Sequence, residues 1–172
     1  MSVNVSGRQL ADPSFPETIR RVLERHDLPG ENLRIEMTES TVIDVPDQMR
    51  DALAAIAALG VNAQLDDFGT GYSSLTFLHH FSGDAIKIDR SFVMSMHTDS
   101  ANEEIIRAII ELAHNLGLKV IAEGVEEEEQ LALLLSVGCE CAQGFFFAKP
   151  LKPEGTRDFL KKWELAPMAP AL

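Results

Sequence analysis

Short apolar segments alternate six times with longer amphipathic segments along this chain, and this alternation restricts its fold more than any other feature. The strands predicted from it are 3–6, 32–38, 61–66, 85–88, 119–122 and 141–146. The helices predicted between and after them are 15–26, 47–59, 73–80, 102–116, 127–137 and 153–163. A series of this kind forms a parallel sheet in which the helices make the crossovers.

Two α/β architectures fit such a series, an open doubly wound sheet and part of a (β/α)8 barrel. Both place their functional residues at the carboxyl ends of the strands. A complete barrel usually takes about 250 residues, and the chain has 172. It can therefore supply about six of the eight units.

The composition excludes several classes of function. The net charge is −12, with 27 acidic against 15 basic residues, which disfavours duplex nucleic acid as a partner. No apolar stretch reaches the roughly 20 residues of a membrane span, and the first residues show no signal-peptide pattern. We expect a cytoplasmic protein with one domain over residues 1–164 and a flexible tail at 165–172.

Every predicted strand carries polar residues at or just beyond its carboxyl end. They are Asn4, Glu36 with Glu39, Asp66 with Asp67, Lys87 with Asp89, Glu123, and Gln143. Because the carboxyl ends of parallel strands meet at one edge of the sheet, these side chains are expected to share a pocket. Buried carboxylates must be paired or bound to metal, and oxygen ligands suit hard divalent cations.

Asp66 and Asp67 form the most informative pair, because a turn with glycines at 69 and 71 follows them. Adjacent residues of a regular strand point to opposite faces. For both carboxylates to serve one site, the strand must end there and the chain must turn. An ordinary acidic turn that caps a helix is the alternative for this short motif alone.

Taken in order, these motifs resemble those of the EAL-domain family, bacterial phosphodiesterases that hydrolyse cyclic di-GMP. The matching segments are Asn4-Val5-Ser6, Glu36-Met37-Thr38-Glu39, Asp66 through Leu75, Lys87-Ile88-Asp89 with Phe92, Ala122 through Glu126, and Gln143-Gly144 with Pro150. The resemblance implies a TIM-like barrel whose first strand runs antiparallel. About six βα units of it are present in this chain, and the first two are missing.

The resemblance also implies roles. The implied ligands of two Mg²⁺ or Mn²⁺ ions are Asn4, Glu36, Asp66, Asp67 and Glu123. The implied catalytic residues are Lys87, Glu123 and Asp66, with Lys87 holding the attacking water. Gln143 and Asp67 would bind substrate, Glu39 would brace the loop at 68–74, and Asp89 would support the Lys87 region.

One departure leaves the function open. The Glu-Ala-Leu motif that names the family, whose glutamate is a metal ligand, does not occur in the chain. The first hypothesis is metal-dependent hydrolysis of cyclic di-GMP to linear pGpG. The second is a catalytically impaired module that binds cyclic di-GMP or a partner protein. Without the resemblance, the strand ends also permit another metal-dependent barrel enzyme, such as an aldolase or a sugar-phosphate hydrolase.

The resemblance further implies a homodimer or higher oligomer, with flanking sensory or GGDEF domains.

Overall fold

The computed structural model describes residues 1–42, 47–71, 78–79 and 81–165, and its centre is a six-stranded parallel sheet. The strands are β1 (Ser2–Asn4), β2 (Arg34–Thr38), β3 (Asn62–Phe68), β4 (Ala85–Ile88), β5 (Lys119–Glu123) and β6 (Cys141–Gln143). Each strand pairs with the next one in the chain. A doubly wound sheet reverses its strand order partway, whereas a barrel adds every strand on the same side. The observed order is that of an incomplete (β/α)8 barrel.

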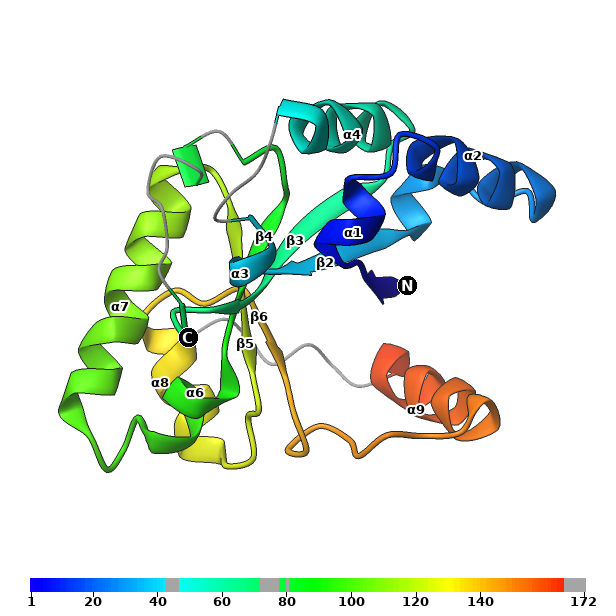
Figure 1. Ribbon diagram of the computed structural model, residues 1–172. Coiled ribbons are helices and arrows are strands. Elements are labelled where there is room, and N and C mark those ends of the chain that lie inside the picture. Colours follow the sequence, from blue (N-terminus) through cyan, green and yellow to red (C-terminus); the bar gives the residue numbers. More distant parts are fainter. Residues whose placement is uncertain (43–46, 72–77, 80, 166–172) are drawn as a thin grey trace.

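The helical segments in chain order are α1 (Gly7–Leu10), α2 (Phe15–Arg25), the 3-10 turn η1 (Gly30–Asn32), α3 (Glu39–Val42), α4 (Asp47–Ala58), α6 (Arg90–Ser95), α7 (Ser100–Asn115), α8 (Glu128–Ser136) and α9 (Pro153–Leu165). The longer helices α2, α4, α7 and α8 lie around the outside of this half-barrel (Figure 1). Figure 1 shows α9 standing apart from the other helices. Within the described ranges, no helix combines the length and apolarity that a membrane crossing needs.

Along most of the strands, apolar side chains on the outer face alternate with side chains on the inner face, and several of the inner ones are polar. On β4, Ile86 and Ile88 are fully buried against the helices, while Lys87 between them points to the other side. On β5, Val120 and Ala122 are buried on the outer face, and Ile121 between them belongs to the inner face. Because side chains alternate along a strand, the outer face forms the core and the inner face collects polar groups.

Most predicted elements occur in the predicted order, but several ends are wrong. β3 continues to Phe68 instead of ending at 66. β6 ends at Gln143 instead of 146, because the chain turns and the amides of Phe147 and Ala148 donate to the carbonyl of Gly144. The short helices α1, η1, α3 and α6 were not predicted, since one or two turns show too little periodicity.

Three predictions fall partly outside the described residues. Of the loop at 68–74, which Glu39 is expected to brace, only 68–71 are described. Of the helix predicted at 73–80, only 78 and 79 are described, and both are helical. The last helix continues to Leu165, one residue into the predicted tail, and 166–172 are not described.

Candidate functional site

Lys87 lies at the centre of the polar inner face. Its ammonium group contacts carboxylates from three other strands: Glu36 at 3.0 Å, Asp66 at 2.9 Å and Glu123 at 2.6 Å. The Lys87 side chain is only 6% exposed, and its three partners are between 12% and 16% exposed. The structure therefore brings together four predicted site residues that are up to 87 positions apart in sequence, since Glu36 and Glu123 differ by that number.

The charges of this cluster do not balance. Three carboxylates face one ammonium group, so the fully ionised cluster carries two excess negative charges. Burial penalises uncompensated charge strongly. A divalent cation carries the charge that would neutralise the excess, so the donor set fits one.

The pKa values reflect the same imbalance. Burial opposes the charge on Lys87, but its hydrogen bonds to Glu123, Asp66 and Glu36 prevail and raise its pKa above the ordinary 10.5. Burial raises the pKa of Glu123, and the Lys87 hydrogen bond only partly offsets this effect. The lysine therefore stays charged at neutral pH, while Glu123 binds a proton more readily than an exposed glutamate does.

Asp66 and Asp67 serve the same site through an irregular stretch of β3. The register of β3 against β4 shifts between Leu65 and Phe68, and Asp67 has a left-handed φ of 52°. The expectation that the strand ends at the aspartates is thus wrong, because the irregularity lies inside the strand. Such an irregularity turns a side chain away from the alternating pattern. Burial, followed by the charge of Asp66, raises the pKa of Asp67.

Three carboxylates in this region are spaced to share a metal ion. Asp66, Asp67 and Glu123 each offer an oxygen, and these oxygens lie within 4.8 Å of one another. Glu36 reaches the group through Lys87. Asn4 is exposed on β1, and its backbone is in register with that of Glu36 on β2. Strand pairing therefore places these two implied metal ligands side by side. The predicted ligands thus lie along one edge of the sheet.

Gln143 is held against the catalytic candidates from the next strand. It pairs in register with Glu123, and its Nε2 donates to Glu123 Oε1 at 2.6 Å. One oxygen of Glu123 therefore meets both the Lys87 ammonium and the Gln143 amide. This arrangement fixes the orientation of the carboxylate.

Glu39 and Asp89 accept hydrogen bonds from backbone amides near the site. The buried Glu39 carboxylate accepts hydrogen bonds from the amides of Gly69, at 3.0 Å, and Gly71, at 3.2 Å. A Cβ at Gly71 would lie 3.2 Å from the Glu39 carboxylate, so this approach favours glycine. Asp89 caps α6 by accepting from the amide of Ser91 at 2.9 Å.

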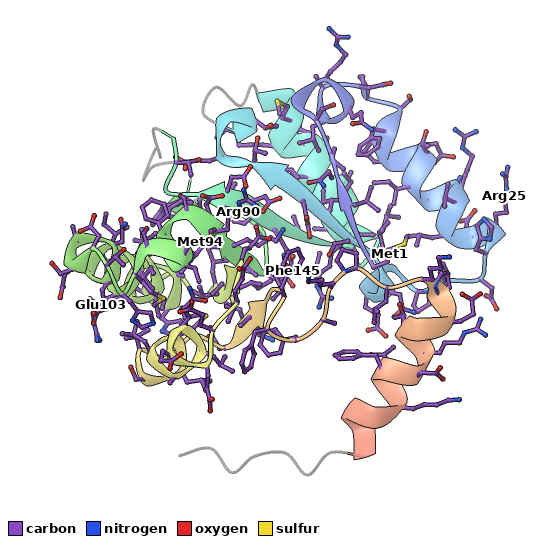
Figure 2. All side chains as sticks on the ribbon, turned by 90° about the horizontal axis from the view of Figure 1, so that it is seen from below. Met1, Arg25, Arg90, Met94, Glu103 and Phe145 are labelled. Atoms are coloured by element: carbon purple, nitrogen blue, oxygen red, sulfur yellow. The ribbon has the colours of Figure 1, made fainter. Side chains whose placement is uncertain are left out.

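A cavity of about 430 Å³ opens beside this cluster at the carboxyl ends of β5 and β6. Its lining includes Arg90, Met94, Glu123, Glu126, Gln143 and Phe145. Figure 2 shows Arg90, Met94 and Phe145 in the middle of the view, between Glu103 on one side and Arg25 on the other. The lining residues Arg90 and Met94 of α6, and Phe145 after β6, were not among the predicted site residues. Their position directly after two strand ends was the available signal.

Gln64 was also missed. It is 4% exposed and lies on the inner face of β3, in register with Glu36 of β2. Its place in the middle of a strand gave no signal, because functional residues of parallel α/β folds are expected at the carboxyl ends of the strands.

The fold and these residues define a parallel α/β barrel-type domain with a buried acidic and lysine-containing site at its strand ends. The sequence profile of the EAL domain matches residues 1–150, and the chain belongs to that family. The chain is 40% identical to the cyclic di-GMP phosphodiesterase NbdA of Pseudomonas aeruginosa over 163 residues, covering 95% of this chain and 21% of NbdA. It is 38% identical to the cyclic di-GMP phosphodiesterase PdeR of Escherichia coli, covering 95% of this chain and 25% of PdeR.

Solved structures agree with the family assignment. A complex of the phosphodiesterase PaMucR with c-di-GMP superposes with a TM-score of 0.86 at 39% identity, covering 90% of this chain and 63% of that chain. The manganese/cy-diGMP complex of Klebsiella pneumoniae BlrP1 superposes with a TM-score of 0.80 at 35% identity. The match covers 87% of this chain and 38% of the BlrP1 chain. The chain spans between a fifth and about a quarter of the length of the curated relatives it matches.

Proposed function

We propose that this chain forms the catalytic part of a phosphodiesterase that hydrolyses cyclic di-GMP to linear pGpG with the help of divalent cations. The observation that carries the proposal is the Lys87 cluster, in which three strands each supply a carboxylate to one buried ammonium group. The named activities of the relatives NbdA and PdeR support the choice of substrate.

The residues that would hold Mg²⁺ or Mn²⁺, two ions in all, are Asn4, Glu36, Asp66, Asp67 and Glu123. When bound, such ions supply an activated water and positive charge at the phosphate. The short distances between the oxygens of Asp66, Asp67 and Glu123 support this assignment. The crystallised BlrP1 complexes with calcium and with manganese support a divalent cation in this family.

The chain's own residues would position and protonate the reacting groups. Hydrolysis to pGpG forms a bond from a water oxygen to phosphorus and breaks the bond from phosphorus to a 3′ oxygen, which takes up a proton. Lys87 would neutralise charge that develops on the phosphate. Burial raises the pKa of Glu123, so this carboxylate accepts a proton more readily than an exposed glutamate does, as a general acid or base requires. Gln143 and Lys87 keep the Glu123 carboxylate in one orientation.

The cavity beside the cluster suits part of a dinucleotide. It joins the apolar surface of Met94 and Phe145 to the cation of Arg90. An aromatic ring and a guanidinium group are chemically suited to a nucleobase and to a phosphate. In a chain of net charge −12, such a cation close to the acidic cluster favours an anionic ligand.

The test is turnover of cyclic di-GMP by the 172-residue chain with Mg²⁺ or Mn²⁺, compared with Asp66→Asn and Lys87→Met. Glu103→Gln is the control, because Glu103 lies on α7 in an exposed ion pair with Arg107. We expect pGpG from the parent chain and from the control, and a loss of at least about 100-fold in both site variants. Turnover that survives Asp66→Asn and Lys87→Met would contradict the proposal.

A second candidate function is a module that binds cyclic di-GMP or a protein without hydrolysis. It is favoured by the six strands of the described residues, which leave one side of β1 and one side of β6 without a neighbouring strand. Such edges invite pairing with another chain. Calorimetry with cyclic di-GMP separates the two functions. Binding without pGpG production favours the module that binds cyclic di-GMP. Absence of both binding and turnover contradicts the phosphodiesterase and favours a scaffold that binds a partner protein.

We also propose that the protein acts in bacterial second-messenger signalling in the cytoplasm, as a homodimer or higher oligomer flanked by sensory or GGDEF domains. The small share of its relatives that the chain spans supports flanking domains. One relative, MucR of Pseudomonas aeruginosa, is a bifunctional diguanylate cyclase/cyclic di-GMP phosphodiesterase. Light scattering of the purified chain tests the oligomer, and a monomer at all concentrations would contradict it.

A further inference from the structure

Gln130, on α8, is a buried polar residue outside the acidic cluster, and its side chain joins three segments of the chain. It is 4% exposed. Its Oε1 accepts from the amides of Glu126, at 2.8 Å, and Glu127, at 3.1 Å. Its Nε2 donates to the carbonyl of Val93 at 3.3 Å. A buried amide is costly unless it is hydrogen-bonded, and here both ends of it are used.

The bond to Val93 matters because α6 is short. The last carbonyl groups of a helix have no partner within the helix, and α6 has only six residues. Gln130 supplies the partner for one of them. A second contact holds the same helix, since a Cβ at Gly124 would lie 2.6 Å from Arg90 Cβ. The loop after β5 and the helix α6 are therefore packed together without space for a side chain.

The segments joined by Gln130 form two walls of the cavity beside Glu123. Arg90 and Met94 belong to α6, and Glu126 belongs to the loop after β5. Residues 143–150, at and after the end of β6, form the third wall. Backbone hydrogen bonds connect this wall to the loop: the amide of Val125 donates to Gln143, and the amide of Phe146 donates to Val125. A change in how α6 meets the loop would therefore change the width of the cavity.

We propose that Gln130 is a positioning residue that sets the distance between α6 and the β5–α8 loop, and so the shape of the cavity that receives the substrate. It touches no reacting atom. The proposal rests on the proposed function, because it assigns the cavity to cyclic di-GMP.

Two variants separate this role from simple helix capping. Gln130→Glu keeps an oxygen for the two loop amides. Their hydrogen bonds and the helix N-terminus favour the ionised carboxylate, which cannot donate to Val93. Gln130→Met removes both functions at similar size. If Gln130 only caps α8, the Glu variant should behave like the parent chain and only the Met variant should be affected.

The first readout needs no ligand. Hydrogen–deuterium exchange of the α6 amides should rise about 5- to 10-fold in both variants, the change expected when one hydrogen bond is lost. Exchange in α6 that is unchanged in Gln130→Glu would overturn the proposal. This readout decides it even if the parent chain neither binds nor hydrolyses cyclic di-GMP, a result that would overturn the proposed function instead.

The second readout is kinetic. With turnover by the parent chain, both variants should raise KM for cyclic di-GMP about 5- to 10-fold and leave kcat within about 2-fold. Asp99→Ala is the matched control, since Asp99 caps α7 through the amide of Ala101 and does not line the cavity. It should lower the melting temperature as Gln130→Met does, without changing KM. An unchanged KM in both Gln130 variants would overturn the proposal and leave the proposed function standing.

Discussion

Replacement of Lys87 by Met tests whether the ammonium group holds the acidic cluster together. Methionine keeps most of the apolar volume of the side chain but removes its charge. Three carboxylates that now lie 2.6 to 3.0 Å from the ammonium nitrogen would lose their shared partner. They are too buried for water to replace it fully.

The size of the effect follows from this burial. Removing one partner of a buried ion pair costs about 3–5 kcal/mol, a large part of the roughly 5–15 kcal/mol that stabilises a typical domain. With a urea m-value of about 2 kcal/mol/M, the unfolding midpoint should fall by about 2 M. Because the pKa of Lys87 is raised above 10.5, its contribution is complete below that pH and is lost only as the pH rises through the raised value. The deficit should therefore be present throughout the neutral range.

The assay is urea unfolding at about pH 8 in EDTA, repeated with Mn²⁺. Lys119→Met is the matched control, because Lys119 is an exposed lysine at the start of β5, and it should change stability by less than about 0.5 kcal/mol. Mn²⁺ should restore more stability to Lys87→Met than it adds to the parent chain, since the variant cluster lacks its only cation. A Lys87 variant as stable as the Lys119 control in EDTA would refute this reasoning.

Three further predictions concern the same region. Burial raises the pKa of Glu123, so ionisation of this carboxyl group costs folding free energy as the pH rises from 4.5 through the pKa of the folded state. Glu123→Gln should therefore unfold at a higher urea concentration than the parent chain at neutral pH in EDTA. A lower urea midpoint would contradict this prediction. Glu39→Ala should lower stability by about 2–4 kcal/mol and speed exchange of the Gly69 and Gly71 amides, which lose their acceptor, and Glu39→Gln should restore part of both. Gly69→Ala should cost about 1–3 kcal/mol in thermal unfolding, because φ is 96° and an aromatic ring of α6 lies 2.8 Å from the added carbon. Gly117→Ala, with φ of 74° but open space, should cost less, and equal losses would show that crowding does not contribute.

The sequence predicted the order of the strands because their signal is local. On β4, an apolar residue on each side of Lys87 indicates a strand with one buried face, whatever lies elsewhere in the chain. The short helices α3 and α6 escaped prediction, because a helix of one or two turns depends on its packing and its caps more than on periodicity. The strand pattern alone left the choice between a doubly wound sheet and a barrel open, since it depends on which strands become neighbours. The resemblance to the EAL family predicted the barrel, and the observed strand order confirms it.

By itself, the sequence determined the chemistry of the site: oxygen donors and one lysine at the ends of successive strands, in an order that resembles the EAL family. Only the tertiary structure decided how they meet. Strand pairing brings Glu36, Asp66 and Glu123 to the same ammonium group, and the irregularity in β3 turns Asp67 to the side of Asp66. Nothing in the sequence indicated the positioning role proposed for Gln130, because that role depends on a hydrogen bond to the carbonyl of Val93, 37 positions away. Residue types and spacing are local properties, whereas charge balance and cavity shape arise only when distant segments pack together.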